Sequence, residues 1–227
     1  MAKQPDYKAA VSHLKGCDAK LRNLIEKVGE PNITLRHSHT IFYSLMRAII
    51  YQQLAGAAAS AILGRVEALA DGYQMTPEQL LSLPDERLRG AGLSKNKLAA
   101  LRDLAAKVLD DTVPTARQMV RMDDEEIIAR VTQVRGIGRW TVEMLLIFRL
   151  GRMDILPLDD FGVRKGFQRA YKLKDMPTRK ELAARGARWS PWRSVAAWYL
   201  WRSCEMKPAA RKAPLANSSP RKSKRPK

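Results

Sequence analysis

Two short sequences decide the fold of this chain: Val-Arg-Gly-Ile-Gly-Arg-Trp-Thr at residues 134–141 and Leu-Pro-Leu-Asp-Asp-Phe-Gly at residues 156–162. In the first, two glycines flank one isoleucine, which permits a tight turn whose backbone N–H groups point outward with no side chain in the way. Such a turn can bind a phosphate group. The second sequence places an acidic pair before another apolar segment. This short span therefore contains both a candidate anion-binding turn and a carboxylate.

Helical periodicity dominates the rest of the chain, and no alternating run of β-branched residues is long enough to predict a strand. We therefore predict an all-α fold, with helix starts marked by N-cap residues and capping-box spacings. The predicted helices begin at Pro77 after Thr76, run from Ser94 to about Leu109, begin after Asp123, run from Arg139 to Leu150 with Gly151 as the stop, and run almost unbroken from Phe42 to Ala70. The glycine turn then lies between two helices, as a helix-hairpin-helix motif.

The chain is strongly basic. Its formal net charge is +18 over 227 residues, and eight Lys or Arg with no acidic residue lie in 207–227, which leaves about +10 for residues 1–206. A polyanion such as DNA is the expected partner. We predict that residues 1–206 form the folded domain and that 207–227 form a basic, disordered tail.

Several other classes of protein do not fit the composition. Cys17 and Cys204 are too few for a disulfide framework or a four-cysteine cluster, and the three histidines have no metal-ligand spacing, so we predict no metal site. We find no apolar run of transmembrane length and no hydrophobic signal segment at the start. We expect a soluble, intracellular protein without a membrane partner, cytoplasmic and nucleoid-associated in a bacterium or nuclear in a eukaryote.

Taken together and in this order, several motifs resemble the helix-hairpin-helix DNA glycosylases, most of all their alkylation-repair branch, the 3-methyladenine glycosylases. The resemblance spans roughly residues 40–205 and implies two helical lobes with the active cleft between them. The motifs are Gln-Gln-Leu at 52–54, Ala-Gly-Leu-Ser at 91–94, Gly-Ile-Gly-Arg-Trp-Thr at 136–141, Pro-Leu-Asp-Asp at 157–160, and Trp-Ser-Pro-Trp-Arg-Ser at 189–194 with the aromatic residues that follow.

Asp160 matches the catalytic aspartate of that family. Cleavage of an N-glycosidic bond builds positive charge on the deoxyribose, and a fixed carboxylate can stabilise that charge and orient or deprotonate the attacking water. Asp160 also precedes a predicted helix, so it can serve as an N-cap at the same time. Asp159 is the rival candidate, for which we favour a cap or supporting role, and we expect Asp154 to be structural.

Trp140 distinguishes two reaction classes. In the lyase members of the family a lysine at this position forms a Schiff base with the sugar, whereas an indole cannot act as a covalent nucleophile. The resemblance therefore implies a monofunctional glycosylase that uses water and leaves an abasic site, with no required cofactor.

The resemblance also implies residues that handle the target base, which must leave the duplex stack before it can react. Gln53 is our first candidate for the side chain that fills the gap and Leu54 the second, while a buried helical glutamine is the structural alternative. Trp189 matches the family's pocket tryptophan, with Trp140 and Met144 as further pocket residues. We assign Trp192, Trp198 and Trp201 to the core, because they follow a helical repeat.

The hairpin is expected to hold a DNA phosphate without reading sequence. The alternative is an ordinary connecting turn. The family often places a monovalent cation between hairpin carbonyls and the phosphate, and the same cation is possible here. The predicted phosphate-binding residues are Arg135, Gly136, Ile137, Gly138, Arg139 and Thr141.

We interpret the chain as a monomeric glycosylase that hydrolyses the N-glycosidic bond of alkylated purines in double-stranded DNA, which initiates base excision repair. Two alternatives stay open: excision of deaminated or mismatched bases, and a helix-hairpin-helix module that recognises lesions without cutting. The sequence does not rank the alkylated bases as substrates.

Overall fold

The computed structural model describes residues 6–35, 39–72 and 74–206, so the predicted basic tail at 207–227 lies outside the described residues. All regular elements within these ranges are helical, which confirms the all-α prediction. The elements are α1 (Tyr7–Cys17), α2 (Ala19–Val28), α3 (Ile41–Tyr51), α4 (Gly56–Glu67), α5 (Pro77–Ser82), α6 (Asp85–Gly90), α7 (Lys95–Leu109), α8 (Ala116–Met119), α9 (Asp124–Val131), α10 (Arg139–Phe148), α11 (Phe161–Tyr171), α12 (Arg179–Gly186), the 3₁₀ helix η1 (Ala187–Trp189) and α13 (Arg193–Glu205). No helix in these ranges is long and apolar enough to cross a membrane.

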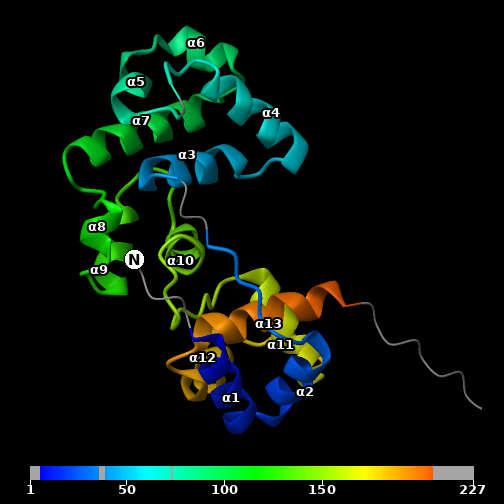
Figure 1. Cartoon of the computed structure of the whole chain (residues 1–227). Helices are drawn as coiled ribbons and strands as arrows, with labels where there is room; N and C mark the ends of the chain where they lie inside the picture. The colour runs from blue at the N-terminus through cyan, green and yellow to red at the C-terminus, as the bar shows by residue number, and fades with distance from the viewer. Residues whose placement is uncertain (1–5, 36–38, 73, 207–227) are drawn as a thin grey trace, which may run out of the picture.

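The helices form two lobes, as the resemblance implied. Helices α3 to α10 surround one hydrophobic cluster, whereas α1 and α2 pack with α11, α12 and α13 around a second cluster. The two ends of the chain thus build one lobe together, and the middle builds the other (Figure 1). Phe148 and Trp201 pack against both clusters, with ring centroids 5.6 Å apart, and so mark the junction between the lobes.

The predicted caps account for several helix starts. Thr76 and Gln79 form a reciprocal capping box at α5, and the side chains of Ser94 and Asp123 accept backbone N–H groups at the starts of α7 and α9. Two further capping boxes begin α8 and α12. Because the caps satisfy N–H groups that would otherwise lack partners, they fix where these helices begin.

The prediction of one helix from Phe42 to Ala70 is wrong. Helix α3 ends at Tyr51 and α4 begins at Gly56, with Gln53 between them in the left-handed region at φ 58°. The ammonium of Lys97 donates to the carbonyls of Ile50 (2.6 Å) and Gln52 (2.9 Å), so a tertiary contact stabilises the end of α3. Local sequence gave no signal for this break, since residues 52–54 contain neither glycine nor proline.

Candidate active site and DNA-binding surface

The hairpin between α9 and α10 presents an exposed backbone on a buried anchor. Ile137 is buried and its N–H already donates to the Val134 carbonyl (3.0 Å), while Gly136 and Gly138 are exposed. Gly136 has φ 78°, a conformation that favours glycine, whereas Gly138 has φ −98° and a Cβ there would meet nothing within 4 Å. Gly136 therefore shapes the turn, and Gly138 leaves its surface open.

The end of α10 at the hairpin is suited to an anion. None of the described side chains caps this helix, and the Thr141 N–H donates to the Gly138 carbonyl (3.0 Å), so the first-turn N–H groups left for a phosphate are those of Arg139 and Trp140. Arg135 is exposed beside them, and its own N–H donates to Asp103 Oδ2 (2.7 Å). Burial raises the pKa of Asp103, but hydrogen bonds from Lys107 and from the Arg135 N–H outweigh it and hold this pKa below its ordinary value.

The side chains of Arg139 and Thr141, two of the predicted phosphate-binding residues, are engaged elsewhere in the structure. The guanidinium of Arg139 forms ion pairs with Glu125 and with the buried Glu143, which offset its positive charge. Burial raises the pKa of Glu143, and the ion pair with Arg139 lowers it only in part. Thr141 is buried and lines a cavity behind the hairpin, so its side chain contributes to that cavity.

Asp160 is buried, with 8% of its surface exposed, at the junction of the lobes. Its Oδ1 accepts the Val163 N–H (2.7 Å), which makes it the N-cap of α11, and the Trp201 Nε1–H (2.8 Å). Its Oδ2 accepts the Trp140 Nε1–H (2.7 Å). Three N–H donors thus address a group that, when ionised, can only accept hydrogen bonds. They fix both oxygens in place.

The two indoles reach Asp160 from different lobes. Trp140 extends from the first turn of α10 and is 48% exposed, whereas Trp201 extends from α13 and also packs on Phe148. The assignment of Trp201 to the core from sequence missed this contact. The three-residue spacing of Trp198 and Trp201 places both on one side of the helix, but it does not say which of them reaches a polar partner.

Gly162 makes room for this arrangement. A Cβ on Gly162 would lie 2.7 Å from Trp201 Cδ1, closer than real Cβ atoms approach a neighbour, and at a tight 3.1 Å from Asp160 Oδ1. A glycine at this position leaves the space that the Trp201 indole needs to donate to the Asp160 carboxylate. The contact between α11 and α13 depends in the same way on Gly166, where a Cβ would overlap the Leu200 carbonyl.

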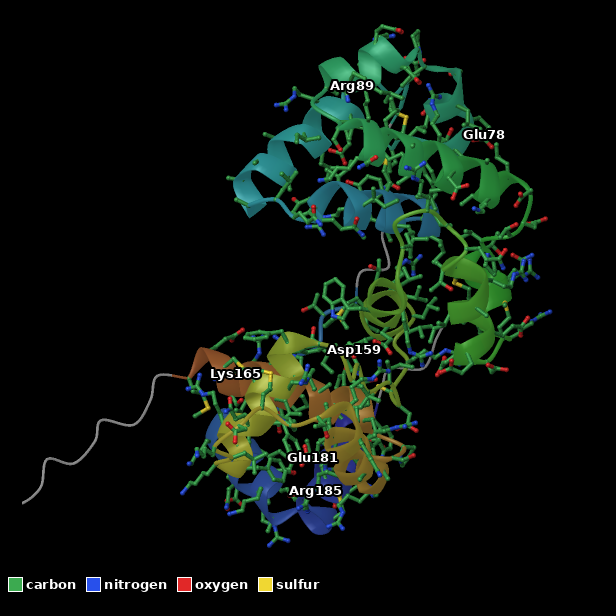
Figure 2. All side chains as sticks on the ribbon, turned by 180° about the vertical axis from the view of Figure 1, so that it is seen from behind. Glu78, Arg89, Asp159, Lys165, Glu181 and Arg185 are labelled. Carbon is green, nitrogen blue, oxygen red and sulfur yellow. The ribbon has the colours of Figure 1, made fainter. Side chains whose placement is uncertain are left out.

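The other two aspartates differ from Asp160. Asp159 is half-exposed and forms an ion pair with Arg179 (3.0 Å), and Figure 2 shows its label beside the junction of the two lobes. Asp154 accepts hydrogen bonds from Arg193 and from the Ser190 hydroxyl, so it ties the loop before α11 to the start of α13. This geometry is structural, as we expected for Asp154.

A cavity of about 610 Å³ lies between α3 and α10, beside the hairpin. Its wall includes the aromatic side chains of Tyr51, Trp140 and Phe148, together with Met144, which the sequence motifs placed in a base pocket. Asp160 is not among the residues that line the cavity, but Trp140 links the two, because its side chain lines the cavity and its Nε1–H donates to Asp160. Its size and aromatic wall suit a planar ring.

The cavity also contains hydrogen-bond donors. Arg47 stacks over the Tyr51 ring, with its guanidinium carbon 4.1 Å from the ring centroid, and Arg149 donates to the His39 carbonyl (2.9 Å). Burial lowers the pKa of Arg149. The cavity therefore combines flat apolar surfaces with cationic donors.

Trp189 does not line this cavity, and its prediction as a pocket residue is wrong. It is fully buried in the lobe formed by the two chain ends, packs against Phe167, and donates from Nε1 to Asp18 Oδ2 (3.3 Å). A base could not reach this indole without unpacking the core. Trp201, twelve residues later, is the tryptophan that the structure brings to the carboxylate.

Gln53 and Leu54 lie in the short loop between α3 and α4. Both are exposed, Leu54 at 38%, which excludes the alternative that Gln53 is a buried helical glutamine. Gln53 also lines the mouth of the cavity. Its neighbour Gln52 donates from Nε2 to the Gly136 carbonyl (2.9 Å), so the loop and the hairpin lie side by side.

Comparison with known proteins agrees with these features. The sequence profile of the HhH-GPD superfamily of base excision DNA repair proteins matches residues 46–191. DNA-3-methyladenine glycosylase 1 of Schizosaccharomyces pombe is 36% identical over 197 residues, which cover 86% of each chain. The putative DNA-3-methyladenine glycosylase YfjP of Bacillus subtilis is 32% identical over 186 residues, which cover 79% of this chain and 63% of that protein.

Solved structures show the same likeness. A DNA-3-methyladenine glycosidase from Bacillus halodurans aligns with a TM-score of 0.80 and 36% identity, over 86% of this chain and 88% of that chain. The 3-methyladenine DNA glycosylase Mag1 of S. pombe, solved in complex with abasic DNA, aligns with a TM-score of 0.76 and 36% identity, over 87% of this chain and 97% of that chain. The chain therefore belongs to the HhH-GPD superfamily of base excision DNA repair proteins.

Proposed function

We propose that this protein is a monofunctional DNA glycosylase, which hydrolyses the N-glycosidic bond of alkylated purines in double-stranded DNA and leaves an abasic site. The observation that carries the proposal is the carboxylate of Asp160, which is buried, held by three N–H donors and linked through Trp140 to a cavity with aromatic walls. The named activity of the S. pombe and B. halodurans relatives supports it.

In this proposal each group has a step. The hairpin and the first turn of α10 hold a phosphate, and the loop carrying Gln53 fills the space that the extruded base leaves. The purine stacks on Trp140 and Phe148 in the cavity. As the bond to the sugar breaks, Asp160 stabilises the positive charge on the deoxyribose and orients the water that attacks it.

An alkylated purine that carries positive charge is already a good leaving group, so one carboxylate and a stacking pocket are sufficient. Trp140 occupies the position of the lyase lysine and is itself bound to Asp160, which supports hydrolysis without a covalent intermediate. A monomer acting on duplex DNA is part of the proposal.

A monovalent cation at the hairpin is also part of the proposal. Backbone carbonyls are the hard oxygen ligands that such ions accept. The carbonyls of Gln133 and Gly136 already accept hydrogen bonds from Lys107 and Gln52, so the cation would use others.

Excision of deaminated purines is a second candidate, favoured by one observation. Arg47 and Arg149 in the cavity wall are donors that suit a base with a carbonyl oxygen. A binding module without activity is a weaker alternative, because lesion binding alone does not require a carboxylate held as rigidly as Asp160.

The test is a base-release assay on duplexes that each contain one 3-methyladenine, 7-methylguanine, 1-methyladenine, ethenoadenine or hypoxanthine. We expect release of at least one alkylated purine, and loss of that release in Asp160→Asn. Release of hypoxanthine alone would favour the second candidate, and binding without release from any duplex would favour the module.

A further inference from the structure

One face of α7 contacts both elements that we assign to DNA. Lys97, Ala100, Asp103 and Lys107 are spaced by three, three and four residues, so they lie along one side of the helix. We call these four residues the α7 brace. None of them belongs to the cavity wall.

The first residue of the α7 brace holds the loop between α3 and α4. Lys97 donates to two carbonyls at the end of α3, those of Ile50 (2.6 Å) and Gln52 (2.9 Å). Carbonyls at a helix end lack intrahelical partners, so the ammonium stabilises the chain where α3 ends. Gln53 then takes the left-handed conformation, and Leu54 follows it into solvent.

The other three residues hold the hairpin. Lys107 donates to the Gln133 carbonyl (2.7 Å), and Asp103 accepts the Arg135 N–H (2.7 Å). The side chain of Ala100 lies under Gly136, where a Cβ on the glycine would approach it to 3.7 Å. Asp103 and Lys107 also pair with each other (2.7 Å), which fixes both side chains.

A direct hydrogen bond joins the loop to the hairpin. Gln52 Nε2 donates to the Gly136 carbonyl (2.9 Å), so the loop is tied to the hairpin and both are tied to α7. A side chain that inserts into a base stack meets resistance from the duplex. The loop that carries this side chain would be displaced unless it were fixed to the hairpin that binds the phosphate. Because the loop is fixed to the hairpin, phosphate binding at the hairpin also holds the inserted side chain in position.

We propose that the α7 brace and Gln52 couple base extrusion to phosphate binding, with Lys97 as the positioning residue that holds the Gln53 loop at a fixed distance from the hairpin. This inference rests on the proposed function, because it assigns the loop to extrusion. A merely structural role is the competing explanation: there, Lys97 would stabilise the lobe and affect all substrates alike.

The test compares Lys97→Met with Lys95→Met, a matched loss of one charge from an exposed side chain two residues away. Each variant is given the same lesion in two duplexes, one with the lesion paired and one with it opposite an abasic-site analogue, where less pairing has to be broken. We expect Lys97→Met to slow single-turnover release from the paired duplex at least about tenfold more than from the unpaired one. Lys97→Arg, which keeps a charged donor, should recover most of the loss, and Lys95→Met should keep the wild-type ratio. Equal slowing on both duplexes refutes the coupling and leaves a structural role.

A second variant keeps the test decisive if Lys97→Met does not fold. Gln52→Leu removes the link to Gly136, at an exposed contact, and also changes one residue of the cavity wall. It should show the same selective loss on paired duplex, whereas a change of the cavity wall alone would slow release from both duplexes. Combination with Gln53→Ala gives a double-mutant cycle. If Gln52 acts through the inserted side chain, the double variant should be no slower on the paired duplex than Gln53→Ala alone, whereas independent effects would multiply and overturn the proposal.

A binding readout separates this inference from the proposed function. 2-Aminopurine beside the paired lesion brightens when a side chain disrupts its stacking, and this signal needs no base release. A wild-type protein that raises the fluorescence but releases no base would refute the proposed function, and a smaller rise with Lys97→Met at saturating protein would still support the coupling. An unchanged rise in Lys97→Met refutes the coupling, whatever the outcome for base release.

Discussion

Replacement of Asp160 by asparagine changes one charge with little change in shape. The asparagine oxygen can keep the hydrogen bonds from Val163 N–H and Trp201 Nε1, because both converge on Oδ1. The amide NH₂ then faces the Trp140 Nε1–H across 2.7 Å, where two donors meet. Asparagine and aspartate are about equal as N-caps, so we expect a loss of about 1–3 kcal/mol in the free energy of unfolding, mostly from this conflict.

The effect on catalysis should be larger than the effect on stability. A unit charge about 4 Å from the sugar, at an effective dielectric constant of about 20, contributes about 4 kcal/mol to the stability of the developing cation. That contribution corresponds to a factor of about 10³ in rate. The binding of lesion duplex should change by no more than about tenfold, because the positive charge on the deoxyribose is not yet formed in the ground state.

Single-turnover base release at saturating protein measures the rate, and fluorescence anisotropy measures the binding. Asp159→Asn is the matched control: its ion pair with Arg179 is half-exposed and contributes little, so its rate should stay within about threefold of wild type. Near-wild-type release by Asp160→Asn would show that charge stabilisation comes from another group. A rate reduced only because the DNA no longer binds would make Asp160 a structural residue.

The remaining predictions concern the reaction class, the hairpin, the basic tail and the response to acid. Product strands should stay intact until alkali is added, and borohydride should trap no complex; efficient trapping would show a covalent intermediate despite Trp140. Gly138→Ala should leave thermal stability unchanged but weaken binding to damaged and undamaged duplex alike. Gly136→Ala should weaken binding in the same way and also lower the free energy of unfolding by about 1–2 kcal/mol, because its φ is 78°. An effect confined to one lesion would place the turn in the base pocket. Truncation after Met206 should leave folding and single-turnover release nearly unchanged and flatten the slope of log affinity against log salt by about 0.9 for each phosphate that the tail neutralises in the full chain; an unchanged slope would mean that the tail does not touch DNA. Burial raises the pKa of Asp154, but its hydrogen bonds outweigh this and hold the pKa below 3.8, so the stabilisation it provides should be present above pH 3.8 and should disappear as the pH falls below that value; denaturant unfolding of wild type and Asp154→Asn should therefore converge in acid, and a constant difference would contradict it.

Local sequence was sufficient for much of the fold. The starts of α5, α7 and α9 follow from Thr76, Ser94 and Asp123, because capping chemistry acts within three residues. The break after Tyr51 could not be predicted, since it depends on Lys97, which is distant in sequence. The predicted end of α10 at Leu150 was two residues too late, and Gly151 follows with φ 70°.

In the candidate site, too, some residues could be located from the sequence and others only from packing. Asp160, the hairpin and the candidate residue Gln53 could be located from motifs, and what each does with DNA stays a prediction. The choice between Trp189 and Trp201 could not be made, because both lie in aromatic segments and only packing decides that one indole contacts Asp18 and the other Asp160. The second role of Trp140 was missed for the same reason: a sequence shows that a side chain is not a nucleophile, but not that its N–H holds the Asp160 carboxylate.

The glycine at position 162 changes how substitutions in this protein should be ranked. A single methyl group there meets the Trp201 ring and Asp160 Oδ1, although it alters no charge and removes no hydrogen-bonding atom. A scale based on chemical similarity would rate Gly162→Ala as mild and Asp159→Asn as severe. The space around the carboxylate reverses that expected order, so substitutions near Asp160 in this protein should be judged first by the volume that they add beneath the Trp201 indole.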